Sequence, residues 1–452
     1  MKNDEIISKM DKWINYIQKY DVEAELYAIN SNVVETTFES NFIKSTSLTE
    51  NSGLGIRIIT PDKRVSFSCT NRLTNDDHIY KIFKKTVKMA KSSAVISYAS
   101  LANPSAKKKQ ISIQENVPDP IENLNFSKEL FDYIRNNDTR INIDLGNSIK
   151  GQALEIIAST NDLFLIDYTE RTAWVVYAFA REGSTVTSGD ICYDAVKGNN
   201  YSRDFSDIDL MKKNLMNQLR AKKINIDNDK KPITIFSPET LLEVIISPLL
   251  DAFDGSKIIR KESPFTDELG SELFHKDISL TDDGTIENCL GTVSFDREGN
   301  SPLKTSMIDK GVFLGILHNQ FSANKSGQEP TGHASGSYRS QPNITSHNLN
   351  LSIRNSTEYI NMIESIDYGV LINGIASYPD FVSGEIQGSI KNSYLITKGK
   401  LTPLKELNIA GNIYNNLKNN LVFSSKEVKV IKLLYSEFSI PWVGFEGFSL
   451  IN

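Results

Sequence analysis

One apolar helix stands at the head of the second half of this 452-residue chain and limits how that half can fold. The sequence SPETLLEVIISPLLDAF, residues 237–253, begins with serine, proline and glutamate, which favour a helix N-terminus. The residues that follow are mostly apolar, so the helix must be enclosed by other elements. A short apolar strand, Ile233–Phe236, precedes it. We therefore expect a helix that packs inside β structure.

The rest of the second half carries strand and turn signals. Turn residues at Asp309–Gly311 and at Lys398–Gly399 lie between extended segments, which predicts two hairpins. The closing residues 440–451 alternate apolar and polar side chains, as a strand does. We expect a β-rich C-terminal domain over residues 231–452, with mostly antiparallel sheet.

The N-terminal half alternates helical and extended patterns. The helical patterns cover residues 4–20, 76–90 and 207–222, and the extended ones lie within residues 22–69 and 154–193. A set of strands closed by a helix therefore occurs twice, an order consistent with an internal duplication. The polar, proline-containing stretch 102–122 is expected to connect the two sets. These patterns predict an α+β protein whose N-terminal half is divided into units 1–105 and 106–230.

Charge and cysteine content narrow the function classes. A net charge of -6 and a pI near 5.6 argue against nucleic-acid binding. No stretch is apolar and long enough to cross a bilayer, and the first residues do not resemble a signal peptide. The three cysteines, Cys69, Cys192 and Cys289, are widely separated and odd in number. We expect reduced, mostly buried thiols in a cytoplasmic protein.

Short catalytic motifs are weak in this sequence. None of the five histidines belongs to a short metal-ligand spacing such as H-E-x-x-H. Gly332–Gly336 resembles a G-x-S-x-G elbow only loosely, because its serine is one place late. Asp296 and Glu298 would share one face of a strand, which suits either a catalytic pair or a solvated edge. Gly53-Leu54-Gly55 lacks the third glycine of a dinucleotide fingerprint.

Several segments in order along the chain resemble the TldD/PmbA family, whose members are also called modulators of DNA gyrase. The matching segments are G-x-G-x-R at 53–57, D-x-E-G at 296–299, P-T-G at 330–332 and S-G-E at 383–385. Residues 308–315 follow the pattern I-x-x-G-x-L-x-G except that Phe313 stands at the leucine position. The match extends over nearly the whole chain.

The resemblance implies two kinds of subunit. TldD-type subunits carry H-E-x-x-x-H on the helix that opens the C-terminal half, and they bind a metal, expected to be zinc, with a late cysteine. PmbA-type (TldE-type) subunits lack these ligands. Here Leu242 and Ser247 occupy the histidine positions, only Glu243 remains, and no cysteine follows Cys289. Pro248 is expected to disturb the helix just beyond.

The chain is therefore similar to PmbA-type subunits, without a catalytic residue or cofactor of its own. The expected partners are a zinc-binding TldD-type catalytic subunit and an extended peptide substrate. The sequence leaves open whether the isolated chain forms a homodimer. The residues expected to line the peptide cleft are Asp296, Glu298, Gly299, Thr331, Gly332 and His333. Two alternatives stay open: an autonomous hydrolase that uses His333, Asp296 and Glu298, and a homo-oligomeric peptide-binding or modulator protein.

Overall fold

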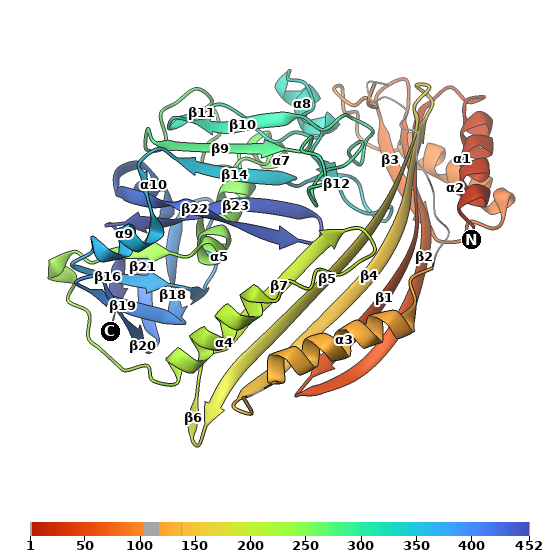
Figure 1. Cartoon of the computed structure of the whole chain (residues 1–452). Coiled ribbons are helices and arrows are strands. Elements are labelled where there is room, and N and C mark those ends of the chain that lie inside the picture. The colour runs from red at the N-terminus through yellow and green to blue at the C-terminus, as the bar shows by residue number, and fades with distance from the viewer. Residues whose placement is uncertain (1, 104–116, 137, 452) are drawn as a thin grey trace.

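The computed structural model describes residues 2–103, 117–136 and 138–451. The chain forms a long N-terminal sheet with helices on it, and a second half in which sheets surround a central helix (Figure 1). Most strand pairs are antiparallel, and the parallel ones are confined to the second half. The predicted α+β class, with a β-rich C-terminal half, is confirmed.

The N-terminal sheet has the strand order β3-β2-β1-β4-β5-β6, with β7 also paired to β5. Its strands are β1 Glu23–Glu39, β2 Phe42–Ile59, β3 Val65–Thr70, β4 Ile141–Ser159, β5 Phe164–Glu182, β6 Thr185–Val186 and β7 Asp190–Lys197. The centre of the sheet is the antiparallel pair β1 and β4, which runs from Glu25–Ser159 to Glu39–Leu145. One sheet thus contains strands from both of the predicted N-terminal units, while the boundary at residues 105–106 itself lies outside the described residues.

Two pairs of helices cover one face of this sheet. Helices α1 (Asn3–Ile17) and α2 (Asp76–Ala90) pack at one end, and α3 (Pro120–Arg135) and α4 (Ser206–Gln218) pack at the other (Figure 1). Alternate residues of a strand share a face, so Leu26 and Thr36 of β1 lie on the same side of the sheet. Leu26 packs in the core beneath α1 and α2, and Thr36 accepts a 2.8 Å hydrogen bond from Asn123 of α3. The element order helix, strands, helix therefore occurs twice around the β1–β4 pair.

Helix α3 was not expected from the sequence. Its inward positions include the apolar Phe126, Leu130 and Ile134, but two of the first three inward positions are the polar Asn123 and Ser127. Both polar side chains are fully buried and hydrogen-bonded, with Asn123 bonded to Thr36 and Ser127 to Ser148 at 2.6 Å. Polar residues at buried positions interrupt the apolar period that reveals a helix in a sequence.

The second half contains an eleven-stranded sheet in the order β11-β10-β9-β14-β23-β8-β16-β19-β20, to which β22 and β15 are attached. A four-stranded sheet has the order β17-β18-β21-β24, and β12 pairs with β13. The strands are β8 Ile233–Phe236, β9 Ile278–Asp283, β10 Lys304–Asp309, β11 Val312–Phe313, β12 Ala334–Ser335, β13 Asn343–Ile344, β14 Asn348–Ile353, β15 Ser356–Thr357, β16 Tyr368–Ile372, β17 Gly374–Ala376, β18 Glu385–Lys391, β19 Ser393–Thr397, β20 Lys400–Leu404, β21 Leu407–Asn412, β22 Leu421–Leu433, β23 Ser436–Phe445 and β24 Ser449–Ile451.

The central helix of this half consists of α5 (Pro238–Leu241), a π-helical turn (Leu242–Ile246) and α6 (Ser247–Ala252). Shorter helices stand between the strands: α7 Gly255–Ile258, α8 Gln320–Ser326, α9 Tyr359–Glu364, α10 Ile413–Asn419 and a 3-10 turn at Asn228–Lys230.

Both predicted hairpins are confirmed. Strands β10 and β11 pair across Lys310 and Gly311, and β19 and β20 pair across Lys398 and Gly399. All four turn residues have positive φ, between 47° and 84°, as a type I′ turn requires.

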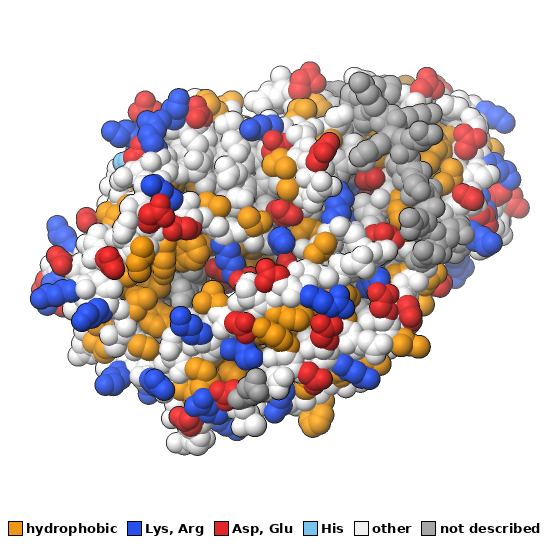
Figure 2. Space-filling view, in the orientation of Figure 1, with side chains coloured by type: hydrophobic (Ala, Val, Ile, Leu, Met, Phe, Trp, Pro, Cys, Tyr) orange, Lys and Arg blue, Asp and Glu red, His pale blue; other side chains and the backbone are white. Residues whose placement is uncertain are grey.

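The surface mixes charges of both signs. On the face in Figure 2, Lys and Arg side chains are interspersed with Asp and Glu. Within the described residues, no helix combines the length and the apolar character needed to cross a membrane. All three cysteines are free; Cys192 is buried, but Cys69 is exposed, contrary to the expectation of mostly buried thiols.

Candidate functional site

The central helix begins as its sequence predicts. Ser237 is the N-cap, and its side chain accepts a hydrogen bond from the backbone N–H of Thr240 at 3.4 Å. Pro238 occupies the first turn, where its missing N–H costs nothing. The helix follows β8 directly and enters the interior between the sheets (Figure 1).

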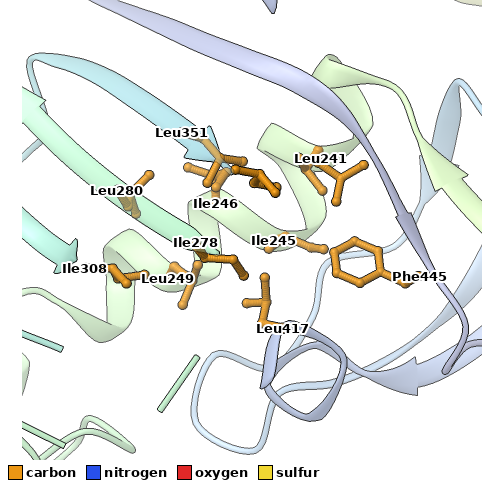
Figure 3. Close-up of a pocket in the computed structure, with 12 residues that line it drawn as sticks. Leu241, Ile245, Ile246, Leu249, Ile278, Leu280, Ile308, Leu351, Leu417 and Phe445 are labelled. Carbon is orange, nitrogen blue, oxygen red and sulfur yellow. The ribbon is translucent and has the colours of Figure 1, made fainter. Parts of the chain in front are cut away.

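The interior face of the helix is packed with apolar side chains. Figure 3 shows Leu241, Ile245, Ile246 and Leu249 among side chains of the eleven-stranded sheet and of α10. The residues that meet them include Ile278, Leu280, Ile308, Leu351, Leu417 and Phe445. This face forms core and offers no polar group to a ligand.

The helix changes to a π-turn at Leu242–Ile246, which by the resemblance corresponds to the metal-binding motif of TldD-type subunits. The backbone N–H of Ser247 donates to the carbonyl of Leu242, five residues earlier, and the Ser247 hydroxyl donates to the same oxygen at 2.8 Å. Pro248 has no N–H for the ordinary bond to Val244, which accounts for the local rearrangement. The predicted disturbance is therefore present, but it lies before Pro248, and the helix continues to Ala252.

The three residues that match the H-E-x-x-x-H motif, Leu242, Glu243 and Ser247, have different surroundings. Leu242 is buried, with 9% of its surface exposed, and belongs to the main core. Ser247 is half-buried and its hydroxyl is occupied by the Leu242 carbonyl. Glu243 is exposed; partial desolvation raises the pKa of its carboxyl, and the nearby charge of Lys391 opposes that rise.

These residues do not fit a zinc ion. Zinc in proteins takes three or four ligands from Cys, His, Asp and Glu. Of Leu242, Glu243 and Ser247, only Glu243 supplies such a group. Across residues 2–103, 117–136 and 138–451 no cluster of three or more of these side chains is arranged to hold a metal.

The second predicted region, the Asp296–Gly299 turn, is buried. Asp296 accepts hydrogen bonds from the backbone N–H groups of Glu298 and Asn300, both at 2.9 Å, and of Ala334 at 3.1 Å. Burial and the charge of Glu298 raise the pKa of Asp296 to about 7, against the pull of these three N–H groups. Gly299 has φ of +91°, a conformation that favours glycine. The aspartate thus holds a turn together.

The two side chains after Asp296 join the halves of the molecule. Glu298 accepts hydrogen bonds from the Arg57 guanidinium of β2 and, at 2.7 Å, from the backbone N–H of Gln320. Arg57 also pairs with Glu25 of β1, and Arg297 donates to Glu25 at 3.0 Å. The Arg297 guanidinium lies 3.6 Å from the centre of the Tyr27 ring.

This group of Glu25, Arg57, Arg297 and Glu298, the interdomain charge network, has no formal net charge. Its four members are each at most 7% exposed. Burial alone would lower the pKa of Arg57, but the charges of Glu25 and Glu298 outweigh it and raise the pKa. The two arginines and the two glutamates are paired with one another, which suits a structural joint.

The remaining predicted cleft residues also lie inside the protein. His333 is fully buried; its Nδ1 is 2.8 Å from the Thr331 hydroxyl and its Nε2 is 3.7 Å from an Asp282 oxygen. His347 bonds the carbonyl of Gly332 through Nε2 at 2.7 Å. The Asp296–Gly299 turn and the Thr331–His333 segment meet through the bond from Ala334 to Asp296. In this chain they support the turn and the segment from inside, and their role in lining a peptide cleft stays a prediction.

Two family models match this chain. A model described as the PmbA/TldA metallopeptidase C-terminal domain matches residues 230–452, and one described as PmbA/TldA metallopeptidase domain 1 matches residues 24–90. Together the two models cover well over half of the chain. The chain belongs to the TldD/PmbA family.

Solved structures of similar proteins share the whole fold of this TldD/PmbA chain. TldE from Thermococcus kodakarensis aligns with a TM-score of 0.83 and 22% identity, over 98% of this chain and 100% of that one. A protein of Thermotoga maritima described as a modulator of a DNA gyrase aligns with a TM-score of 0.80 and 17% identity, over 98% and 99% of the two chains. At these identities the likeness establishes the fold.

Sequence relatives agree with the family. An uncharacterized protein of Methanocaldococcus jannaschii is 25% identical over 98% of this chain and 100% of its own length. A protein named metalloprotease PmbA homolog, from Haemophilus influenzae, is 26% identical over 39% of this chain and 38% of its own length. A metalloprotease of Methanothermobacter thermautotrophicus is 28% identical over 41% of each chain.

The segments that resemble the TldD/PmbA family meet at the interdomain charge network. Arg57, from the G-x-G-x-R strand, pairs with Glu298, from the D-x-E-G turn. Gly53 and Gly55 give room to Tyr338: a Cβ at Gly53 would lie 2.1 Å from its ring, and one at Gly55 would lie 2.8 Å from its backbone oxygen. Gly53 and Gly55 thus allow the two halves of the molecule to pack closely at Tyr338.

Proposed function

We propose that this chain is a PmbA-like, non-catalytic subunit of a cytoplasmic TldD-type metallopeptidase complex that acts on extended or unfolded peptides. The observation that carries the proposal is the central helix. Its histidine-equivalent positions hold a buried leucine, Leu242, and a serine, Ser247, whose hydroxyl is bonded to the Leu242 carbonyl.

The absence of the two histidine ligands accounts for a subunit that does not itself hydrolyse peptides. A metal-assisted peptidase needs a bound metal to polarise the scissile carbonyl and to lower the pKa of a water molecule. Of the residues that match the H-E-x-x-x-H motif, Glu243 alone supplies a carboxylate, and no cysteine follows Cys289 in the sequence. The zinc-dependent steps are therefore assigned to the TldD-type partner.

The N-terminal sheet supports a role in enclosing peptide. On β1 the face opposite the helices begins with Glu25 and Tyr27, which pack against the second half. Farther along the same face, the residues from Ile29 to Thr37 are only half-buried. A long sheet face of this kind, closed at one end and open at the other, suits one wall of a chamber shared with a partner.

The test is reconstitution with a TldD-type subunit that carries both histidines and comes from the same source. We expect the two chains to co-elute in size-exclusion chromatography and to cleave an unfolded peptide faster than the TldD-type chain does alone. Metal analysis should find zinc in the complex at one ion per TldD-type chain. This chain alone should neither retain zinc nor hydrolyse peptide.

A matched pair of variants separates the two subunits' roles. Replacing the metal-ligating histidines of the partner should abolish cleavage, whereas Glu243→Gln in this chain should leave it unchanged. Stoichiometric zinc and peptide hydrolysis by this chain alone would instead support an autonomous hydrolase. Failure to associate, together with a stable homo-oligomer in light scattering, would support a homo-oligomeric peptide-binding or modulator protein.

A further inference from the structure

The outer edge of the N-terminal sheet is formed by β3. Within the described residues this strand pairs only with β2, from Ile59–Val65 to Leu54–Thr70. An isolated bridge between Arg64 and Val95 lies just before β3 and bounds the edge on that side. In an antiparallel pair, alternate residues direct their N–H and C=O groups away from the neighbour. β3 therefore presents backbone donors and acceptors along its outer side.

The sequence of β3 lacks the usual protection of an edge strand. Natural edges carry lysine, proline or a bulge that discourages pairing with another chain. Val65–Thr70 reads VSFSCT and contains no charged residue and no proline, and its pairing with β2 runs without a register shift. Such an edge can accept a further strand.

A polar pocket of about 470 Å³ lies beside this edge. Its walls come from the end of β3 and the segment after it, with Ser68, Thr70 and Arg72, and from α2, with His78, Ile82 and Lys85. The three α2 residues are spaced four and three apart, so they lie in a row along one side of the helix. Side chains of an added strand that point toward α2 would meet this row.

The pocket carries unbalanced positive charge. None of the described residues that line it is acidic. Neither Arg72 nor Lys85 forms an ion pair anywhere in the described part of the chain, although many other cations of the N-terminal half do, such as Lys12 with Asp76 and Lys63 with Glu23. Because Arg72 and Lys85 lie beside an open strand edge without an ion-pair partner, they favour the binding of a strand that carries carboxylates.

We propose that the outer edge of β3 binds an extended acidic peptide segment as an additional strand. Backbone hydrogen bonds to β3 would supply the sequence-independent part of the affinity. Because alternate side chains of a strand share a face, carboxylates at every second position would reach Arg72 and Lys85, with Ile82 providing apolar contact between them. This site is separate from the central helix and does not depend on the role of that helix in a peptidase complex.

Binding is measured with the full chain and a fluorescent octapeptide that has glutamate at alternate positions and threonine between them. Fluorescence anisotropy at low salt should show binding at least about tenfold tighter than that of the same peptide with lysine in place of glutamate. Lys85→Glu and Arg72→Glu should each weaken binding of the acidic peptide by about tenfold. The matched control is Lys81→Glu, an exposed lysine of α2 outside the pocket lining, which should change binding less than about twofold.

Two N-methylated forms of the acidic peptide test strand addition itself. One form is methylated at the odd positions and the other at the even positions. Only one of these two sets of N–H groups faces β3 in an added strand, so one form should lose binding and the other should retain it.

The proposal is overturned if both methylated forms bind alike, or if the lysine peptide binds as well as the glutamate peptide. It is also overturned if Lys85→Glu converts a dimer of this chain to a monomer in light scattering, because a second copy would then occupy the edge. The exposed Cys69 thiol provides a further readout, since bound peptide should slow its reaction with a maleimide.

Discussion

At the scale of single residues, the most consequential side chain outside the central helix is Arg57. It pairs with Glu25 and Glu298, and all three are almost fully buried. We expect Arg57→Met to destabilise the protein by about 3–5 kcal/mol, because the change leaves two buried carboxylates without their shared cation. Urea denaturation followed by circular dichroism measures the loss.

The control for this change is an ion pair of the same type on the surface. Arg260 and Glu262 lie 2.9 Å apart and are each about half exposed, at 52% and 51%. Arg260→Met should cost about 0–1 kcal/mol, because water screens an exposed pair. If the two variants lose the same stability, the interdomain charge network is not a structural joint.

A second residue, His318, predicts how stability depends on pH. It is fully buried, with Nδ1 2.9 Å from the Ser322 hydroxyl and Nε2 3.2 Å from the Gln328 side-chain oxygen. Burial lowers the pKa of His318 from 6.5 to about 4. Below pH 6.5 the unfolded chain therefore takes up a proton that the folded chain refuses until about pH 4, so stability falls between these values.

The variant His318→Gln isolates this contribution. Between pH 7 and pH 4 the wild type should lose up to about 3 kcal/mol more unfolding free energy than the variant does. His78→Gln, at a half-buried surface position, serves as the control and should follow the wild type. Parallel losses in the wild type and His318→Gln between pH 7 and pH 4 would contradict the assignment.

Sequence alone pointed to these residues but did not show that Asp296 and Glu298 are buried. The Asp296–Gly299 turn and the G-x-G-x-R strand were noticed as family segments, yet their contact spans 241 residues, from Arg57 to Glu298. Acidic residues in a turn look solvent-exposed in a sequence, and the buried charge of Glu298 is compensated by Arg57 from the other half. No local pattern carries that information.

At the scale of secondary structure, the π-turn is the element that distinguishes the central helix. A turn with i to i−5 bonding brings residues five apart toward the same side of a helix, and Leu242 and Ser247 are five apart. The backbone thus keeps an arrangement that suits paired ligands, while the side chains needed for binding are absent.

The double variant Leu242→His/Ser247→His tests whether this backbone geometry is sufficient to bind zinc. We expect no stoichiometric zinc after dialysis and no peptide hydrolysis, because a third protein ligand is missing from this chain. Histidine in place of the buried Leu242 should also cost about 1–3 kcal/mol through the burial of a polar ring. Metal analysis and thermal denaturation measure both effects, with Ser247→His alone as the control. One tightly bound zinc per double-variant chain would contradict the prediction.

Elements were predictable where their signal is local. The cap at Ser237 and the turns at Lys310–Gly311 and Lys398–Gly399 depend on a few adjacent residues, and all three were identified. Helix α3 was missed because Asn123 and Ser127 occupy inward positions. The length of the N-terminal strands was also missed, since half-buried polar residues in the middle of β1 break the alternation that marks a strand.

At the scale of the whole molecule, the two halves are joined by packing as well as by charge. Tyr27, Ile157 and Leu165 of the N-terminal sheet form one cluster with Phe295 and Tyr338 of the second half. The interdomain charge network lies beside this cluster, because Arg297 contacts the Tyr27 ring. Unfolding either half alone would expose the apolar cluster and separate the paired charges, so the halves should unfold as one cooperative unit.

The three tryptophans of the chain report on this coupling. Trp13 and Trp174 belong to the cores of the N-terminal half, and Trp442 packs in the second half. With 5-fluorotryptophan incorporated, fluorine NMR during urea titration should show all three native signals disappearing at one midpoint. In Arg57→Met the Trp442 signal should separate from the other two, because the joint is weakened while each half keeps its own core. Coincident midpoints in Arg57→Met would show that apolar packing alone couples the halves, and separate midpoints in the wild type would show that they fold independently.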